Sequence, residues 1–228
     1  MREFTIEEIK AICDSAALPL GVPFIDDRLE EYRVKYNGNH PYYAALRDIV
    51  KALQPAVVLE IGTWQGTSAA AFADGDVGTE VITIDHHSDP GDDVNQKRTL
   101  EACDAFPNIS YIQGCSTEMV RDLKPGTEFV MPTILEYLDG RKIDILFIDG
   151  WHGHAYARAD FDTYAPLLSE NALVICDDIC GGSDGSGDSA AIFGMRQFWD
   201  GLPGEERHLD GRIHPGYPQG YLKYKGKA

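Results

Sequence analysis

A run of strand-forming residues that ends in a glycine turn constrains this chain most strongly. Residues 56–61 are apolar except for one acid, which is typical of a central parallel strand covered on both faces. Gly62 and Gly66 follow, so the chain can turn sharply there and a ligand can approach the backbone. A helix of small residues is predicted over 65–73, with its free N–H groups at the carboxyl end of the strand. The stretch predicts either a nucleotide-like ligand site or an ordinary tight turn.

The spacing of the glycines in this turn indicates which nucleotide-like ligand it could bind. The turn lacks the third glycine of the dinucleotide fingerprint and the lysine of a phosphate-binding loop. Glu60, at the strand end, would repel a pyrophosphate but suits a ligand with a cationic or hydrogen-bond-donating group. S-adenosylmethionine has both and is the expected cofactor. We expect this stretch to contribute the following cofactor-binding residues: Glu60, Gly62, Thr63, Trp64, Gly66 and Thr67.

Composition narrows the class of protein further. The chain has 228 residues, of which 43% are hydrophobic, and this fits one α/β domain with a modest extension. The formal net charge of −17 argues against nucleic-acid or membrane partners. We see no apolar run of membrane-spanning length and no signal peptide at the N-terminus. The five cysteines are scattered, so we expect free thiols and a cytoplasmic location.

Strand-like and helix-like segments alternate from residue 56 onward. Strands are expected at 56–61, 80–84, 109–113, 143–148 and 172–176, with weaker candidates at 207–209 and 220–224. Helices are expected between them, at 65–73, 93–105, 116–123, 129–138, 153–168 and 189–202. This alternation predicts an α/β fold with a parallel sheet and right-handed crossovers.

The N-terminal part of the chain is predicted to be helical. Helices are expected at 6–17, 27–35 and 41–53, the first with a capping box formed by Thr5 and Glu8. Residues 1–54 are therefore expected to form a helical cap or lid, and residues 55–228 the ligand-binding domain. The Gly- and Ser-rich segment 181–188 is expected to be a mobile loop that covers the site.

Acidic residues stand at the carboxyl ends of the predicted strands. Glu60, Asp85, Asp149 and the pair Asp177–Asp178 each occupy such a position. In an open parallel sheet these ends line one crevice, where ligands bind. Asp is also common in turns, which would explain any single one of these positions. Together they would repel one another unless a cation or hydroxyl groups offset the repulsion.

Two roles follow for these acids. Asp85 lies where an acid accepts hydrogen bonds from ribose hydroxyls, and we expect its neighbour His86 to contact the cofactor as well. Asp149, Asp177 and Asp178 could supply oxygen ligands to Mg²⁺ or another divalent cation. Capping of the following helix and loop is the alternative for these three acids.

Two ordered segments resemble a known family. Residues 58–68 look like motif I of class I S-adenosylmethionine-dependent methyltransferases. Residues 147–152, continuing through 159–161 to 164–168, resemble the strand-four signature of one branch. That branch comprises small bacterial O-methyltransferases related to macrolide-sugar methyltransferases and the cephalosporin-hydroxylase-like group. The resemblance covers residues 42–202 and implies a Rossmann-like, doubly wound, mostly parallel seven-stranded sheet whose last strand is antiparallel.

The more distant catechol O-methyltransferase group, similar in topology, implies metal roles. There an Asp after strand four and an acidic pair after strand five hold Mg²⁺, which here correspond to Asp149, Asp177 and Asp178. His152 occupies the position of that group's lysine base and is the expected catalytic base. A capping role, or a polar role beside the metal, is the alternative for His152.

The resemblance also implies the surroundings of the cofactor. The turn after the family's third strand places Cys115 and Ser116 beside the adenine. Asp149 and Trp151 are expected to contribute to the cofactor site. Trp64 and Trp151 could wall the pocket, although ordinary packing would explain either tryptophan equally well.

These observations together predict a function. We expect an S-adenosylmethionine-dependent O-methyltransferase that acts on a hydroxyl of a small molecule, assisted by a divalent metal. A non-catalytic S-adenosylmethionine-binding protein and a metal-independent small-molecule methyltransferase remain open alternatives. The chain could also associate into a homo-oligomer. An iron-oxygenase site at His208, Asp210 and His214 is disfavoured, because these residues follow the α/β core.

Overall fold

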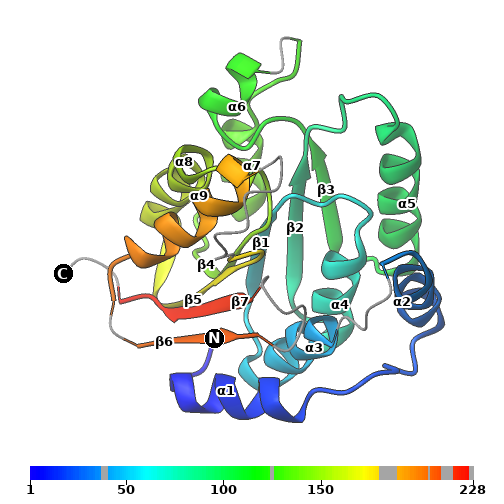
Figure 1. Cartoon of the computed structure of the whole chain (residues 1–228), viewed down its shortest axis with the longest axis vertical. Coiled ribbons are helices and arrows are strands. Elements are labelled where there is room, and N and C mark those ends of the chain that lie inside the picture. Colours follow the sequence, from blue (N-terminus) through cyan, green and yellow to red (C-terminus); the bar gives the residue numbers. More distant parts are fainter. Residues whose placement is uncertain (37–40, 124–125, 180–188, 205, 212–217, 226–228) are drawn as a thin grey trace.

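A seven-stranded sheet runs through the computed structural model, which describes residues 1–36, 41–123, 126–179, 189–204, 206–211 and 218–225 (Figure 1). The strands of this part of the chain are β1 Val57–Ile61, β2 Glu80–Asp85, β3 Ile109–Gln113, β4 Ile143–Ile148, β5 Leu168–Cys176, β6 Arg207–Asp210 and β7 Gln219–Lys223. Their order is β3-β2-β1-β4-β5-β7-β6. β1 to β5 are parallel, and β7 is antiparallel to both β5 and β6. The predicted Rossmann-like, mostly parallel sheet with an antiparallel last strand is confirmed.

Helices cover both faces of this sheet. Their bounds are α1 Ile6–Ser15, α2 Pro23–Tyr36, α3 Tyr42–Leu53, α4 Thr67–Gly75, α5 Asp92–Ala105, α6 Glu118–Leu123, α7 Met131–Leu138, α8 His154–Tyr164 and α9 Ser189–Asp200. Alternate strand residues point to opposite faces, so Val58 packs with α1 to α4 while Val57 and Leu59 pack with α7 to α9. Figure 1 shows α8 and α9 on one side of the sheet and α3 and α4 on the other. The sheet is doubly wound.

The N-terminal helices share a hydrophobic cluster with the sheet. α1 begins with the predicted capping box, in which the Thr5 side chain accepts from the Glu8 backbone N–H and the Glu8 carboxylate accepts from the Thr5 backbone N–H. α3 buries the predicted apolar stripe that includes Leu46 and Ile49. The role of residues 1–54 as a cap stays a prediction. Segment 181–188, predicted to be a mobile lid, lies outside the described residues.

Proline chemistry explains two differences between the predicted and observed elements. α2 begins at Pro23 rather than at residue 27, because proline is well accommodated in the first turn of a helix. α8 ends at Tyr164, and a short 3₁₀ turn over Ala165–Leu167 replaces its predicted end, since Pro166 cannot continue an α-helix. None of the described helices combines the length and the apolar character that a membrane crossing needs.

Candidate active site

A cavity of about 950 Å³ lies at the carboxyl edge of the parallel strands. The loops after β1 to β5 and the beginning of α3 form its wall. Its described lining contains no lysine or arginine. It contains the following carboxylates: Asp85, Asp89, Asp92, Asp149, Asp160, Asp177 and Asp178. The cavity is therefore strongly acidic.

The turn after β1 forms one side of the cavity and depends on Gly62. This residue has a φ of +94°, and a Cβ atom there would lie 2.1 Å from the backbone oxygen of Asp149. The close approach arises because β4 pairs with β1, so that the Asp149 N–H donates to the Ile61 carbonyl at 2.9 Å. Only glycine fits at position 62.

Asp85, at the end of β2, supports the same turn and lines the cavity. Its Oδ2 accepts from the Trp64 backbone N–H at 2.8 Å, and its Oδ1 accepts from the His87 backbone N–H at 3.2 Å. A carboxylate has further lone pairs beyond these two bonds. Asp85 is therefore a fixed acceptor that can still bind hydroxyl groups of a ligand.

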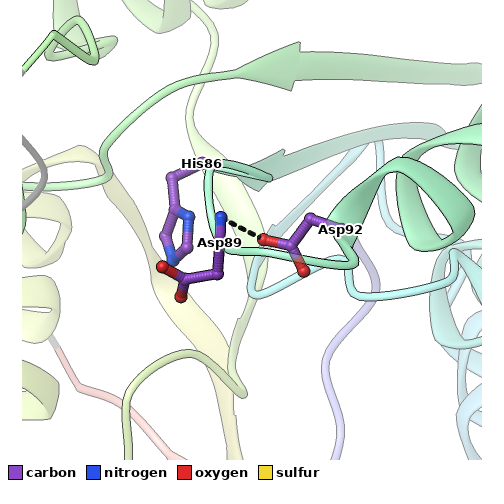
Figure 2. A group of neighbouring side chains, drawn as sticks. All are labelled: His86, Asp89 and Asp92. Carbon is purple, nitrogen blue, oxygen red and sulfur yellow. Dashed lines mark hydrogen bonds between the residues drawn. The ribbon is translucent and has the colours of Figure 1, made fainter.

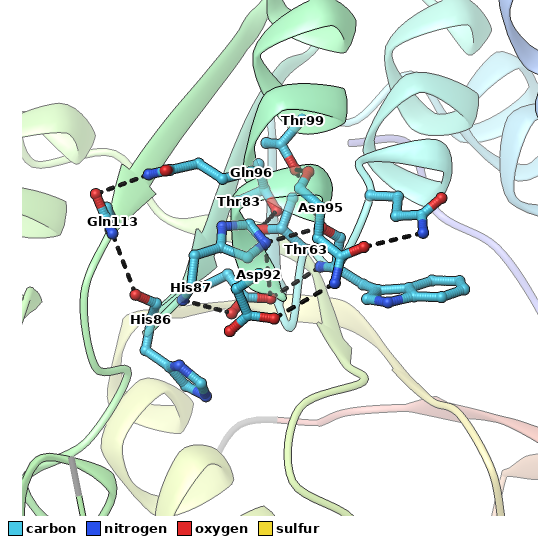
Figure 3. Close-up of polar contacts among 12 residues, drawn as sticks. Thr63, Thr83, His86, His87, Asp92, Asn95, Gln96, Thr99 and Gln113 are labelled. Carbon is cyan, nitrogen blue, oxygen red and sulfur yellow. Dashed lines mark hydrogen bonds and ion pairs between the residues drawn. The ribbon is translucent and has the colours of Figure 1, made fainter. Parts of the chain in front are cut away.

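His87, which our reading of the sequence missed, connects this turn to β3. Figure 3 shows the His87 ring among the polar side chains of this region. Its Nε2 lies 2.8 Å from the carbonyl oxygen of Trp64, and its Nδ1 lies 2.7 Å from the hydroxyl of Tyr111. Because a carbonyl only accepts, Nε2 is the donor, and the neutral ring accepts from Tyr111 at Nδ1. The sequence signal was the pair His86-His87, of which we named only the first. Both line the cavity, but only His87 is buried.

Glu60 is fully buried beneath the turn and does not line the cavity. Its Oε2 accepts from the Thr83 hydroxyl. The Thr83 hydroxyl in turn accepts from the Thr63 hydroxyl, and Figure 3 shows these two threonines side by side. Glu60 Oε1 has no hydrogen-bond partner among the described residues. Burial raises the pKa of Glu60 to about 7. Glu60 thus supports the turn from below, whereas Thr63, Trp64 and Thr67 reach the cavity surface.

Three predicted metal ligands and the predicted base meet at the other end of the cavity. His152 lies between two carboxylates, with Nε2 at 3.3 Å from Asp149 Oδ1 and Nδ1 at 3.4 Å from Asp178 Oδ2. Burial, and next the neighbouring acids, raise the pKa of Asp149 and of Asp177 well above the usual value for Asp. The structure brings together all four residues that the sequence placed here.

Asp177 is supported from the last strand. The Gln219 side-chain amide donates to Asp177 Oδ1 at 3.0 Å, and the Tyr221 hydroxyl donates to the Gln219 carbonyl oxygen. All three side chains are buried. Tyr221 therefore fixes the orientation of the Gln219 amide, which fixes one oxygen of Asp177. Sequence reasoning missed Gln219 because its role arises only when β7 pairs with β5.

The turn after β3 contributes Ser116 but not Cys115. Cys115 is buried in a backbone bridge to Phe129 and does not line the cavity. Ser116 lines the cavity and donates from its hydroxyl to Asp160 Oδ1 at 2.6 Å, while its carbonyl accepts from the Tyr164 hydroxyl at 2.7 Å. Asp160 belongs to the segment that carried the family resemblance, yet we gave it no role from the sequence.

His86, Asp89 and Asp92 form a second polar group in the β2–α5 loop (Figure 2). Asp92 Oδ2, at the first residue of α5, accepts from the Asp89 backbone N–H at 2.8 Å. His86 Nδ1 accepts from the Ser88 backbone N–H at 3.2 Å. Since this bond places the proton of the neutral ring on Nε2, His86 presents a donor rather than a metal ligand. We assign no metal to this group.

Aromatic side chains wall the mouth of the cavity. Trp64 stacks on Tyr32 of α2 at 5.3 Å between ring centroids, and Trp151 stacks on Tyr156 at the same distance. Both tryptophans line the cavity and are partly exposed, at 41% and 45%. Tyr42 and Tyr43 of α3 complete this wall, and we did not expect them from the sequence.

The strand order and a cavity at the carboxyl edge of the sheet define a Rossmann-like class of nucleotide-binding α/β proteins. Residues 59–179 match a family model described as a methyltransferase domain, and the chain belongs to this family. The predicted membership of a methyltransferase family is thereby confirmed. The narrower branch suggested by the sequence stays a prediction.

Solved structures share this fold. The O-methyltransferase from Bacillus cereus in complex with SAH has a TM-score of 0.60 and 15% identity, covering 96% of this chain and 100% of that one. The O-methyltransferase TomG from Streptomyces achromogenes, in complex with SAM, has a TM-score of 0.61 and 17% identity, covering 99% and 100%.

One curated relative has no described activity. The uncharacterized protein y4gI of Sinorhizobium fredii is 27% identical over 161 residues. The match covers 66% of this chain and 15% of that protein, so the chain spans a small part of its relative's length.

Proposed function

We propose that this chain transfers the methyl group of S-adenosylmethionine (SAM) to a hydroxyl of a small molecule, assisted by a divalent cation such as Mg²⁺. One observation carries the proposal. A single cavity holds a fixed acceptor, Asp85, at the turn after β2, and a separate acidic group formed by Asp149, Asp177 and Asp178. Membership of the methyltransferase family supports methyl transfer as the reaction. The SAH and SAM bound in the two similar structures support SAM as the methyl donor.

The turn after β1 and Asp85 would hold the cofactor. Asp85 would accept from the ribose hydroxyls. Thr63, Trp64 and Thr67 would face the rest of the cofactor, while Gly62 and Gly66 let the backbone adopt the turn. The volume of about 950 Å³ is at the upper end for small-molecule sites and leaves room for a second substrate.

The acidic end of the cavity fits a divalent cation. Asp177 is buried and Asp149 is half-buried. The described lining holds no lysine or arginine, so His152 is the only side chain there beside these acids that can carry a positive charge. Hard cations prefer such oxygen ligands. Asp149, Asp177 and Asp178 would hold the ion, which when bound lowers the pKa of a substrate hydroxyl and orients it.

His152 would accept the proton of the substrate hydroxyl. The methyl of a sulfonium needs only an aligned nucleophile, so the protein has to position the substrate and remove its proton. Asp149, 3.3 Å from Nε2, can orient the ring and stabilise the imidazolium that forms. The proton then resides on His152 until the product leaves.

We further propose that residues 1–54 cap the cavity of the domain formed by residues 55–228. α3 contributes Tyr42 and Tyr43 to the wall, and Tyr32 of α2 stacks on Trp64 at the mouth. The substrate would then bind between this aromatic wall and the acidic end. A vicinal diol or a catechol would suit the oxygen-binding end.

Calorimetry with SAM and with Mg²⁺ tests this function through the substitution Asp177→Asn. The variant should lose Mg²⁺ binding and Mg²⁺-dependent methylation of a catechol, because one carboxylate of the acidic group becomes neutral. Its affinity for SAM should stay nearly unchanged, because Asp85 is untouched. Asp162→Asn, on the exposed side of α8, is the matched control.

Two outcomes would contradict parts of the proposal. If chelator-treated wild-type protein keeps full activity, the metal is not needed. If SAM produces no saturable binding heat, the cofactor assignment is wrong. Tight SAM binding without methylation of any hydroxylated substrate would instead support a non-catalytic binding protein.

A further inference from the structure

Gln219 of β7 is a buried amide that contacts the acidic end of the cavity. β7 pairs with β5 so that Gly220 lies opposite Cys176, and this register brings Gln219 to Asp177. Gln219 and Tyr221 are 0% exposed, and Asp177 is 7% exposed. The hydrogen bonds among these three side chains are therefore shielded from water, which makes them stronger than exposed ones.

The chemistry of the three groups fixes the direction of the Gln219 amide. A carboxylate that holds a cation is ionised and only accepts, so the Gln219 nitrogen must face Asp177 Oδ1, which lies 3.0 Å away. The Gln219 carbonyl oxygen then faces Tyr221, whose hydroxyl donates to it. Turning the amide over would place two acceptors against each other at Asp177. Tyr221 thus holds Gln219 in the one orientation that donates to Asp177.

The backbone on both sides of Gln219 is closely packed. A Cβ atom at Gly220 would lie 2.4 Å from Ile179 and 2.8 Å from Trp199. The Ile179 N–H donates to the Pro218 carbonyl at 2.9 Å. The amide therefore cannot withdraw from the carboxylate unless the packing around this strand changes.

The other two acids of the acidic group show a similar arrangement. His152 Nε2 lies 3.3 Å from Asp149 Oδ1, and His152 Nδ1 lies 3.4 Å from Asp178 Oδ2. Each of the three acids therefore has one oxygen beside a side-chain nitrogen, from His152 or from Gln219. Such a group is suited to offer a cation one oxygen per carboxylate.

The number of oxygens that each carboxylate offers discriminates between two common divalent cations. Mg²⁺ demands near-octahedral geometry and keeps several waters, whereas Ca²⁺ takes about six to eight oxygens and often binds a carboxylate through both of its oxygens. Before Asp177 could bind through both oxygens, the hydrogen bond from Gln219 to Oδ1 would have to weaken or break. The buried amide would then lose its acceptor, which is costly.

We propose that Gln219, oriented by Tyr221, is a positioning residue that restricts Asp177 to one oxygen and so makes the acidic group favour Mg²⁺ over Ca²⁺. This inference rests on the proposed function, because it takes Asp177 as a ligand of the cation. Gln219 acts only through Asp177. Removal of its N–H should therefore change which cation is preferred, and not only how tightly cations bind.

Competition with Mn²⁺ tests this selectivity without measuring catalysis. Mn²⁺ favours octahedral oxygen sites, and its free concentration is read by electron paramagnetic resonance while MgCl₂ or CaCl₂ displaces it. The wild type should bind Mg²⁺ more tightly than Ca²⁺. In Gln219→Leu, which removes the amide but keeps a side chain of similar size, the ratio of the Ca²⁺ to the Mg²⁺ dissociation constant should fall roughly tenfold, at the low end of what outer-shell partners contribute to metal affinity.

Two further variants separate orientation from packing. Tyr221→Phe keeps the ring and removes only the hydroxyl, so the same ratio should fall by a smaller factor. Gln197→Leu, on the exposed face of α9, is the matched control and should leave the ratio unchanged. Calorimetry with S-adenosylhomocysteine (SAH) checks that each variant is folded, and its affinity should match that of the wild type because Asp85 is untouched.

The outcomes distinguish this inference from the proposed function. If Gln219→Leu weakens Mg²⁺ and Ca²⁺ by the same factor, Gln219 only supports the fold and the inference is wrong. Should Gln219→Leu not fold, an unchanged ratio in Tyr221→Phe has the same meaning. A wild type that binds Ca²⁺ at least as tightly as Mg²⁺ overturns the inference as well. A wild type that binds none of the three cations would overturn the metal of the proposed function instead.

Discussion

Glu60 shows how a single buried acid makes the stability of this fold depend on pH. Its carboxyl lies under the β1–α4 turn, and one of its oxygens has no hydrogen-bond partner among the described residues. The pKa is raised from 4.5 to about 7, so the folded protein binds a proton that the unfolded chain has already released. The contribution of Glu60 to stability is therefore present at low pH, falls between pH 4.5 and pH 7, and is lost above that range.

Glu60→Gln should remove this dependence. The neutral amide keeps the acceptor that Thr83 uses and introduces no charge at high pH. Urea denaturation across this pH range should show a loss of up to about 3 kcal/mol from Glu60 in the wild type and a flatter curve in the variant. Above pH 7 the variant should be the more stable protein. Asp160 contributes a similar slope to both proteins.

The control for this measurement is Glu136→Gln, on the exposed face of α7. Its stability curve should follow that of the wild type. Parallel curves for Glu60→Gln and the wild type would show that the buried acid does not titrate with a raised pKa.

At the scale of elements, the β1–α4 turn contacts the end of β4. This contact brings together the two sequence segments that resemble the family, residues 58–68 and 147–152. Gly62→Ala should destabilise the protein by several kcal/mol or prevent folding, because its Cβ would lie 2.1 Å from the Asp149 carbonyl oxygen. Gly91→Ala is the matched control. Gly91 has a similar φ of +96° but nothing within 4 Å, so only backbone strain of about 1 kcal/mol is expected. Equal losses in chemical denaturation would contradict the steric argument.

The sequence predicted the strands better than the contacts between them. β3 and β4 occupy the predicted segments 109–113 and 143–148, because apolar runs bounded by turn residues are local signals. The observed helix ends differ from the predicted ends by up to four residues. For example, α4 begins at Thr67 rather than at residue 65, because residues 65 and 66 belong to the turn.

In the candidate site, too, some residues could be predicted from the sequence and others could not. Acids at strand ends could be read from order along the chain and the rule for parallel sheets. The role of His87 depends on its contact with Tyr111 of another strand, and that of Asp160 on its contact with Ser116, which is distant in the sequence. The role of Gln219 likewise depends on its contact with Tyr221. Hydrogen-bond partners of this kind leave no periodic pattern. They could be found only once the sheet order was known.

The charge of the whole molecule should shape its ligand binding. The chain carries a net charge of −17, and its cavity is lined by acids without a described lysine or arginine. SAM carries a positive sulfonium that SAH lacks. If both bind as proposed, raising KCl from about 0.05 M to about 0.5 M should weaken SAM several-fold and SAH much less, because salt screens the attraction.

Calorimetry in the presence of a chelator measures this difference, since a bound divalent cation would mask part of the acidic charge. An equal salt dependence for the two ligands would show that the acids of the cavity do not act on the sulfonium.

The order of the strands along the chain also sets the order in which the cavity walls are synthesised. β1 to β3, the Gly62 turn and Asp85 emerge from the ribosome long before Gln219 of β7. β4 must then insert beside β1, and β7 beside β5, before Asp177 gains its support. The wall that carries Asp85 is thus made first, and the wall that carries Asp177 is made last. A nascent chain that stalls before β7 would carry a half-built cavity in which Asp177 lacks the hydrogen bond from Gln219.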